Sequence, residues 1–308
     1  MNKSKKILLS LIVPALVLIF RPLDLSLEQA VILASLFLVL TFWINKSVGR
    51  TVSSVFLLAI FLLFSGAPPE KILFFPLTDN FYLIIFSFLF SEGIVKSKLI
   101  DKMFKPYIGF LATTPIKLMM TISVMAAVMI FMVPQPFSRL IILAMIFREF
   151  FDGAGVNEKL KDKLLFITFL IPMIMNTFLL KGDIIMNTAV VNLSGAAIDE
   201  GLWFRLLALP GTGMLILSLA LFLLIYKKEL VDYSPEKNGK PKLDLIIEDW
   251  INLSVIVFTI ALWALEKYHP IPSAGVILIG TILMFIRRIL TLQDLKAIEW
   301  PLMIFLTA

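Results

Sequence analysis

The sequence contains no cysteine and only one histidine among its 308 residues. The absence of cysteine excludes disulfide bonds, thiolate metal sites and a cysteine nucleophile. A lone histidine leaves no histidine-based catalytic dyad. Charged residues are also scarce: they make up 16% of the chain, against about a quarter in soluble domains. Together these absences exclude a water-soluble enzyme, a nucleic-acid-binding module, a disordered chain and a secreted disulfide scaffold.

Apolar residues dominate instead. They make up 59% of the chain, and the mean hydropathy is +0.96. A membrane span needs about 20 apolar residues, so the length allows roughly eight to ten membrane elements. We therefore predict an all-α polytopic membrane protein whose partner is the lipid bilayer and not nucleic acid. Residues 1–20 begin with a basic segment and lack a small-residue cleavage site, which favours a retained first span over a signal peptide.

The apolar run Leu118–Val133 stops at Pro134-Gln135-Pro136 and resumes as the short run Leu140–Phe147. Eight helical residues reach only about 12 Å into a hydrocarbon core of about 30 Å. This shortness favours a re-entrant hairpin over residues 118–147. The alternative is an ordinary loop between two short helices.

A second interruption follows the run Leu164–Met175, where Asn176-Thr177 and Lys181-Gly182-Asp183 precede the next apolar run. We interpret residues 164–197 as a broken helix, and again an ordinary loop is the alternative. Interrupted hydrophobic segments of this kind are the usual sequence indication of a transporter binding site. Non-helical backbone inside a bilayer is tolerated only where protein buries it or where it lines a cavity.

The distribution of basic residues predicts a topology. With a cytoplasmic N-terminus, 22 of the 28 Lys and Arg residues fall on the cytoplasmic side, as the positive-inside rule requires. Arg21, Lys71, Arg205 and Lys267 fall on the opposite side, and Arg139 and Lys181 lie at the two interruptions. The polar stretch 227–249 is predicted to be a cytoplasmic linker. We expect the protein in a cell membrane, with the bacterial inner membrane favoured.

Several segments resemble one family of membrane transporters. They are Trp203–Gly211, with its early arginine and its Leu-Pro turn, Glu248-Asp249-Trp250, Ala261-Leu262-Trp263 and Leu290–Trp300. The last of these is the most specific, and Ser65–Glu70 and Glu92–Lys96 match more diffusely. In these segments the chain resembles the divalent anion/sodium symporter family of the ion transporter superfamily, whose members carry dicarboxylates, citrate and sulfate.

The resemblance implies a transporter-type inverted repeat and a homodimer. In each repeat a re-entrant hairpin and a discontinuous helix would face the corresponding pair near the membrane midplane. Residues 1–226 would hold the first spans and the first repeat, with hairpin 118–147 and broken helix 164–197. Residues 227–249 would be the linker, and 250–308 would begin the second repeat. We expect the second repeat to be incomplete, because the chain stops at Ala308, before a second hairpin.

The chain departs from the family pattern at both interruptions. The family carries Ser-Asn-Thr at the hairpin tip, where this sequence has Pro134–Arg139. The family carries Gly-Thr-Pro-Pro-Asn in the broken helix, where this sequence has Lys181–Ile185 and only Gly182 fits. The sodium site that the family implies is therefore altered here.

Polar groups at the interruptions are the candidate substrate-binding residues, and they are Gln135, Ser138, Arg139, Asn176, Thr177, Lys181, Gly182 and Asp183. A fixed cation beside a bound sodium ion is electrostatically unfavourable. We therefore hypothesise that Arg139 and Lys181 replace sodium and neutralise an anion directly, since arginine binds carboxylate or sulfate in a bidentate manner. Helix N-termini near Leu140 and Ile184 would add positive dipole ends.

Each cation also has a structural alternative. Lys181 could pair with Asp183 in its own loop. Arg139 could extend to the lipid headgroups from a shallow hairpin.

These patterns predict secondary active transport of a small divalent anion, such as a dicarboxylate, citrate or sulfate, by alternating access. Sodium as a coupling ion stays open, and no other cofactor and no catalytic residue is expected. The alternative is a non-transporting membrane scaffold or subunit derived from such a transporter, for example in cell-envelope assembly. A membrane enzyme is disfavoured because no reactive constellation is present.

Overall fold

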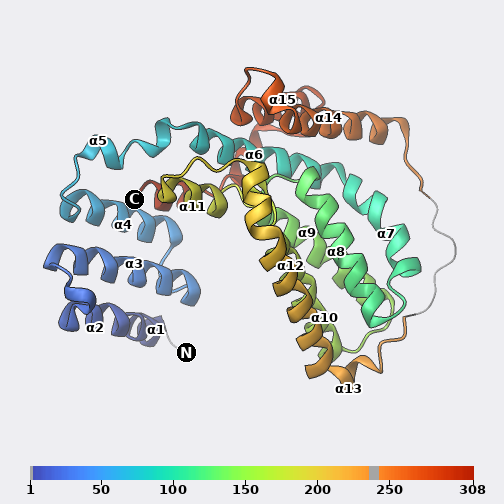
Figure 1. Ribbon diagram of the computed structural model, residues 1–308, viewed down its shortest axis with the longest axis horizontal. Helices are drawn as coiled ribbons and strands as arrows, with labels where there is room; N and C mark the ends of the chain where they lie inside the picture. The colour runs from blue at the N-terminus through green and yellow to red at the C-terminus, as the bar shows by residue number, and fades with distance from the viewer. Residues whose placement is uncertain (1–2, 236–242) are drawn as a thin grey trace. The chain divides into compact units, whose positions relative to one another are not determined.

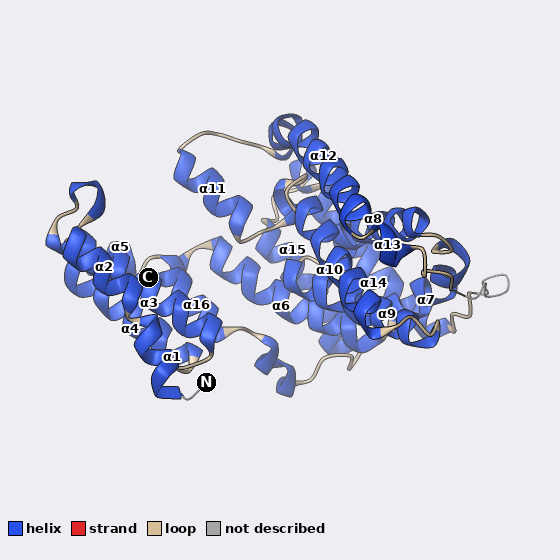
Figure 2. Ribbon diagram, turned by 90° about the horizontal axis from the view of Figure 1, so that it is seen from below, coloured by secondary structure: helices blue, strands red, loops and turns tan. Residues whose placement is uncertain are grey.

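The structure is a computed structural model that describes residues 3–235 and 243–308. Within these ranges it consists of helices and loops and has no strand (Figure 2). The predicted all-α class is confirmed. Residues 236–242, in the middle of the predicted cytoplasmic linker, lie outside the described ranges.

The chain forms two compact units. The first unit comprises residues 1–82 and 298–308. Its helices are α1 (Lys3–Ser10), α2 (Ile12–Phe20), η1 (Pro22–Asp24), α3 (Leu27–Asn45), α4 (Arg50–Phe64), α5 (Pro69–Ile72), η2 (Phe75–Leu77) and α16 (Trp300–Thr307). Figure 1 shows α2, α3 and α4 packed in sequence order, and α16 packs against α4.

The second unit comprises residues 83–297 and contains both interruptions. Its helices are α6 (Asp79–Ser97, of which the first turn belongs to the first unit), α7 (Leu99–Leu111), α8 (Pro115–Met132), α9 (Pro136–Gly153), α10 (Glu158–Met175), η3 (Leu180–Gly182), α11 (Met186–Ser194), α12 (Glu200–Ile225), α13 (Lys227–Leu230), α14 (Ile247–Ala264), η4 (Glu266–Tyr268), α15 (Ser273–Ile286) and η5 (Leu292–Ala297).

Helix α10 is the centre of the second unit, since it packs against α8, α9 and α12. The side chains at these contacts are apolar and fully enclosed, as Leu118, Leu143 and Ile167 illustrate. Figure 1 shows α8 and α9 side by side, joined by a short turn. Helices α14 and α15 form a separate antiparallel pair, which contacts α8 and α7 through α14.

The hairpin is longer than its apolar runs predicted. Helix α9 has 18 residues and rises about 27 Å, so the prediction of a short limb at Leu140–Phe147 was wrong. Arg148 and Glu149 interrupt the apolar run but are compatible with a helix, which therefore continues to Gly153. The short second limb was the reason for predicting a re-entrant hairpin. With α9 at 18 residues, that reason no longer applies, and re-entrance stays a prediction.

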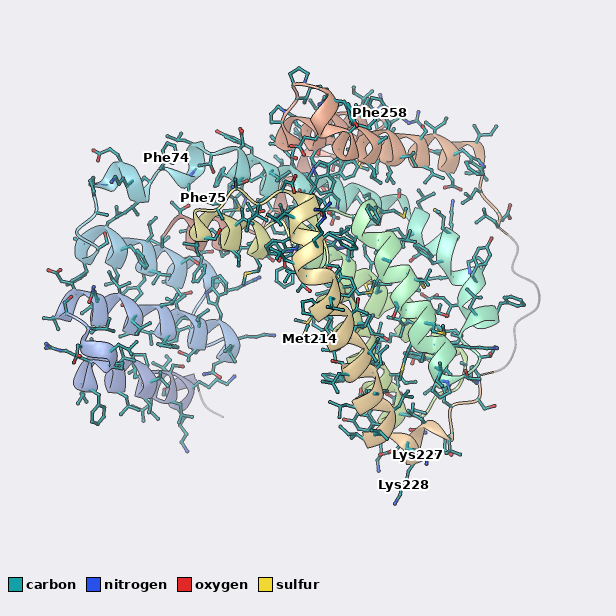
Figure 3. The ribbon with its side chains drawn as sticks, viewed as in Figure 1. Phe74, Phe75, Met214, Lys227, Lys228 and Phe258 are labelled. Atoms are coloured by element: carbon teal, nitrogen blue, oxygen red, sulfur yellow. The ribbon has the colours of Figure 1, made fainter. Side chains whose placement is uncertain are left out.

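Three of the described helices are long and apolar enough to cross a membrane: α3, α8 and α12. Helices α4 and α15 are apolar but shorter. The C-terminal end of α12 is followed by Lys227 and Lys228, whose side chains extend away from the helices (Figure 3). Basic residues directly after an apolar helix are typical of the cytoplasmic end of a span.

A close helix crossing in the second unit depends on Gly280 of α15. A Cβ atom at this position would lie 2.5 Å from Thr259 Oγ1 of α14 and 2.7 Å from the Phe90 ring of α6. Three helices therefore meet where one side chain is missing.

We predict that Gly280→Ala lowers the thermal unfolding midpoint of the detergent-purified protein, because overpacking costs about 1–3 kcal/mol. The matched control is Gly213→Ala in α12, where an added Cβ meets nothing within 4 Å. Alanine stabilises a helix interior by about 0.5–1 kcal/mol relative to glycine, so this variant should unfold at the same or a higher temperature. Equal midpoints for the two variants would contradict the close crossing.

Candidate functional site

The hairpin tip, residues 133–135, turns the chain between α8 and α9. The Gln135 side-chain oxygen accepts the backbone N–H of Ser138 at 2.6 Å, and Pro136 occupies the first helical position. Both features start a helix at Pro136, since a side-chain cap and an N1 proline favour a helix start. The helix N-terminus expected near Leu140 is therefore at Pro136. The Gln135 backbone N–H donates to Ser91 of α6 at 3.3 Å, which fixes the tip against that helix.

The second interruption, residues 176–185, is called here the break, and it lies between α10 and α11. Asp183 Oδ1 accepts the backbone N–H groups of Ile185 and Met186 at 3.1 and 2.9 Å. The second helix accordingly begins at Met186 and not at Ile184. The two limbs of the predicted broken helix would be α10 and α11.

Side chains from other helices satisfy the exposed backbone of the break. Glu200, in the first turn of α12, accepts the N–H groups of Leu180 and Lys181 at 2.9 and 3.2 Å. Trp203 donates from its indole nitrogen to the Thr177 carbonyl at 2.9 Å. Hydrogen bonds from polar groups of α12 therefore stabilise the non-helical backbone of the break.

Asn187 of α11 donates hydrogen bonds to carbonyl oxygens of the break. Its side-chain nitrogen donates to the carbonyl oxygens of Asn176, Leu179 and Leu180, at 2.9–3.3 Å. A buried amide that meets three carbonyls has a structural role at this position.

Arg139 joins the tip to the break. Its guanidinium donates through Nη1 to the Ile130 carbonyl of α8 at 3.2 Å and through Nη2 to the Gly182 carbonyl. Only 1% of the residue is exposed, so the alternative in which Arg139 extends to the lipid headgroups was wrong. The guanidinium is instead enclosed between α8, α9 and the break.

Three buried polar atoms around this arginine have no hydrogen-bond partner: Gln135 Nε2, Arg139 Nε and Asn176 Oδ1. Gln135 and Asn176 are 1% and 5% exposed. The Gln135 oxygen is already engaged by Ser138, so the free end of this amide is a donor. Two unpaired donors and one unpaired acceptor in a buried place are available to hydrogen-bond a ligand or an ordered water, and such a bond is favourable because an unsatisfied buried polar group is costly.

Gly182 is required where it lies. A Cβ atom there would be 2.3 Å from the Asn176 carbonyl oxygen, which is backbone and cannot move aside as a side chain could. The close approach holds Gly182, whose carbonyl Arg139 binds, against the backbone of Asn176. The candidate site is thus formed by Gln135, Arg139, Asn176 and Gly182.

Other predicted site residues have different roles in this structure. The Thr177 hydroxyl donates to the Ile174 carbonyl at 2.7 Å, and Asp183 caps α11. Ser138 is half-buried and contributes its backbone N–H to the cap of α9. These residues were predicted as site residues because they lie close to Arg139 or Gly182 along the chain.

Lys181 pairs with Glu266 of η4, so the structural alternative in which it pairs with Asp183 was wrong. The ammonium also donates to the Trp263 carbonyl at 3.3 Å and lies 5.0 Å from the centre of the Trp263 ring. Glu266 accepts a second hydrogen bond from Ser273 at 2.8 Å. About a third of each charged side chain is exposed, so this pair is more open to its surroundings than Arg139. It connects the break to the turn between α14 and α15.

The sequence reasoning missed Glu200, Asn187 and Glu266. An interrupted helix in a membrane protein needs side-chain partners for its backbone groups. Carboxylates and amides in apolar surroundings can provide them, so residues such as Glu200 and Asn187 could have been considered as partners of the break. The partners of Lys181 could not be identified in this way, since Glu266 is 85 residues further along the chain.

A model of the citrate transporter family matches residues 36–308, which include the second unit with its tip and break and part of the first unit. The chain belongs to the citrate transporter family. No curated protein matches the chain.

Membership of the citrate transporter family confirms the resemblance at the level of the ion transporter superfamily. With the apolar helices, it indicates an integral membrane protein of anion transport. A transporter family also agrees with the expectation that the chain is not an enzyme.

The Lys181–Glu266 pair should stabilise the folded protein. We predict a coupling free energy of about 0.5–1 kcal/mol from a double-mutant cycle of Lys181→Met, Glu266→Gln and the double variant, since partly exposed pairs contribute in this range. The measurement is the midpoint of chemical unfolding in detergent. Additive effects of the two substitutions would show that the ion pair does not form.

The same pair gives a pH dependence. Partial burial raises the pKa of Glu266, but hydrogen bonds from Lys181 and Ser273 and the ammonium charge outweigh it, so the pKa lies below its ordinary value. A lowered carboxyl pKa stabilises the folded state above the ordinary pKa, and this contribution is lost as the pH falls through the lowered value. The difference in unfolding midpoint between wild type and Glu266→Gln should therefore be full at neutral pH and vanish in acid. A constant difference would contradict the pairing.

Proposed function

We propose that the protein carries a small anion with two or more acidic groups, of the citrate, dicarboxylate or sulfate class, and binds it between the hairpin tip and the break. The observation that carries this proposal is the environment of Arg139. Its guanidinium occupies two backbone carbonyls and leaves Nε unpaired, and the free amide nitrogen of Gln135 is a second unpaired donor. Carboxylate and sulfate oxygens are the acceptors that such donors bind most strongly.

Arg139 takes the place of a coupling cation in this proposal. Carbonyls of unwound helix segments coordinate Na⁺ in many secondary transporters. Here the carbonyls of Ile130 and Gly182 accept hydrogen bonds from a guanidinium instead. A sodium ion at the same oxygens would be repelled by the adjacent fixed charge. Anion binding is therefore proposed to be independent of sodium.

Lys181 contributes less to anion binding in this proposal than its position at the second interruption suggested. Its ammonium is bound by Glu266 and by the Trp263 carbonyl, so it contributes charge to the anion only where that pair opens. Arg139 has no ion pair at salt-bridge distance among the described residues, although the Asp183 carboxylate is near enough to interact with its charge. We assign the anion primarily to Arg139 and Gln135, with Asn176 as the acceptor for a protonated oxygen or a water.

Access to this site requires movement. Gln135 and Arg139 are almost fully enclosed, so an anion reaches them only when the tip and the break separate. Alternating exposure of the site to the two sides of the membrane is the transport cycle that we propose. A homodimer, expected from the family resemblance, belongs to the same proposal.

A scaffold function is the second candidate, and one observation favours it. The chain satisfies the carbonyls of the break and the ammonium of Lys181 with its own groups, as a site that no longer opens would do. A folded protein that transports none of the three anion classes would support this alternative.

The test is uptake of labelled citrate, succinate and sulfate into proteoliposomes, with and without a sodium gradient. We expect uptake of at least one anion without sodium. Arg139→Ala should reduce it by about 10- to 150-fold, the factor for the loss of a charge-assisted hydrogen bond of about 1.5–3 kcal/mol. Gln135→Ala should reduce it less, since the amide is neutral.

The matched control is Arg148→Ala, which removes an exposed arginine from the same helix. It should leave uptake unchanged. Wild-type uptake that strictly needs sodium would refute the replacement of sodium by Arg139. Uptake that survives Arg139→Ala would refute the site itself.

A further inference from the structure

A cavity of about 800 Å³ lies between α7 and α8, away from the tip and the break. Tyr107, Phe110 and Leu111 line it from α7, and Lys117, Met120 and Val124 line it from α8. Its walls are largely apolar, and its volume is in the range of ligand-binding sites, about 300–1,000 Å³. No part of the proposed transport function uses this cavity.

The cavity is open on its outer side. Phe110, Met120 and Val124 are all more than half exposed. Helix α8 is one of the described helices that are long and apolar enough to span a membrane, and the exposed face of a span lies against hydrocarbon. An open apolar cavity in that medium accommodates a hydrocarbon chain.

Lys117 is the charged residue of this lining, and it lies in the first turn of α8. Neighbouring lysines are paired: Lys102 binds Asp249, and Lys105 binds Glu149 and Asp101. Lys117 is exposed and has no ion pair among the residues that the structure describes. It is therefore a free cation at the end of an apolar cavity, where the span begins.

We propose that this cavity binds one anionic phospholipid. An acyl chain occupies the space between α7 and α8, and the phosphate lies against the Lys117 ammonium. A single cation beside a long apolar surface complements a molecule with an anionic head and a hydrocarbon tail. Basic pockets at the cytoplasmic ends of membrane helices recognise lipid headgroups in this manner.

The experiment is native mass spectrometry of the detergent-purified full chain with added phosphatidylglycerol or phosphatidylcholine of identical acyl chains. We expect one phosphatidylglycerol to be retained in preference to phosphatidylcholine. Lys117→Gln should lower its retention about fivefold, the factor for one lysine near an anionic headgroup. Met120→Trp, which fills the cavity from an exposed position, should lower retention of the same lipid.

The matched control is Lys159→Gln, which removes an exposed lysine from the first turn of α10, outside the cavity lining. It should retain the lipid as wild type does. Equal loss in Lys159→Gln and Lys117→Gln, or equal retention of both lipids by wild type, would refute the headgroup contact. Unchanged retention in Met120→Trp would refute the position of the chain.

A second copy of the protein is the competing occupant of this face. The chain has no cysteine, so Val124→Cys reports on it directly by oxidative cross-linking in proteoliposomes. We expect no disulfide-linked dimer after oxidation. A disulfide-linked dimer would show that another subunit covers the cavity and would overturn the lipid proposal.

Discussion

The structure depends on one constraint: a helix that is interrupted within a membrane protein must find other partners for its backbone N–H and C=O groups. Water is not available to them in hydrocarbon, and each unsatisfied group costs several kcal/mol. In this chain the partners are side chains. Glu200 serves the N–H groups of the break, while Asn187 and Arg139 serve its carbonyls. The polar contacts that α9, α11 and α12 make with the break follow from that requirement.

The same requirement explains why the candidate site contains unpaired atoms. Arg139 has five N–H donors, and the carbonyls of Ile130 and Gly182 use only part of them. The Nε–H of Arg139 is among the donors left over, and it is buried and unpaired, as are Gln135 Nε2 and Asn176 Oδ1. The side chain that satisfies these backbone groups is thus the same one that carries the free donor of the proposed site.

Local features of the structure were predictable from the sequence, and contacts between distant segments were not. Pro134 and Pro136 predicted the hairpin tip, and the polar residues from Asn176 to Asp183 predicted the break. The length of α9 was underestimated because charged residues such as Arg148 end an apolar run without ending a helix. The pairing of Lys181 with Glu266 joins residues 85 positions apart. No periodicity or motif in a single sequence indicates such a contact. A possible partner in the same loop, such as Asp183, can be read directly from the sequence.

The fixed position of Arg139 has an energetic consequence for a transporter. A dissolved cation enters with the substrate and leaves on the other side, so its gradient can drive accumulation. A guanidinium bonded to the chain returns with the empty site and performs no net work over a cycle. Against a membrane potential of 100 mV, negative inside, uptake of a divalent anion is opposed by about 4.6 kcal/mol. A carrier whose only cation is tethered must therefore draw this energy from another gradient or from the outward movement of a second anion.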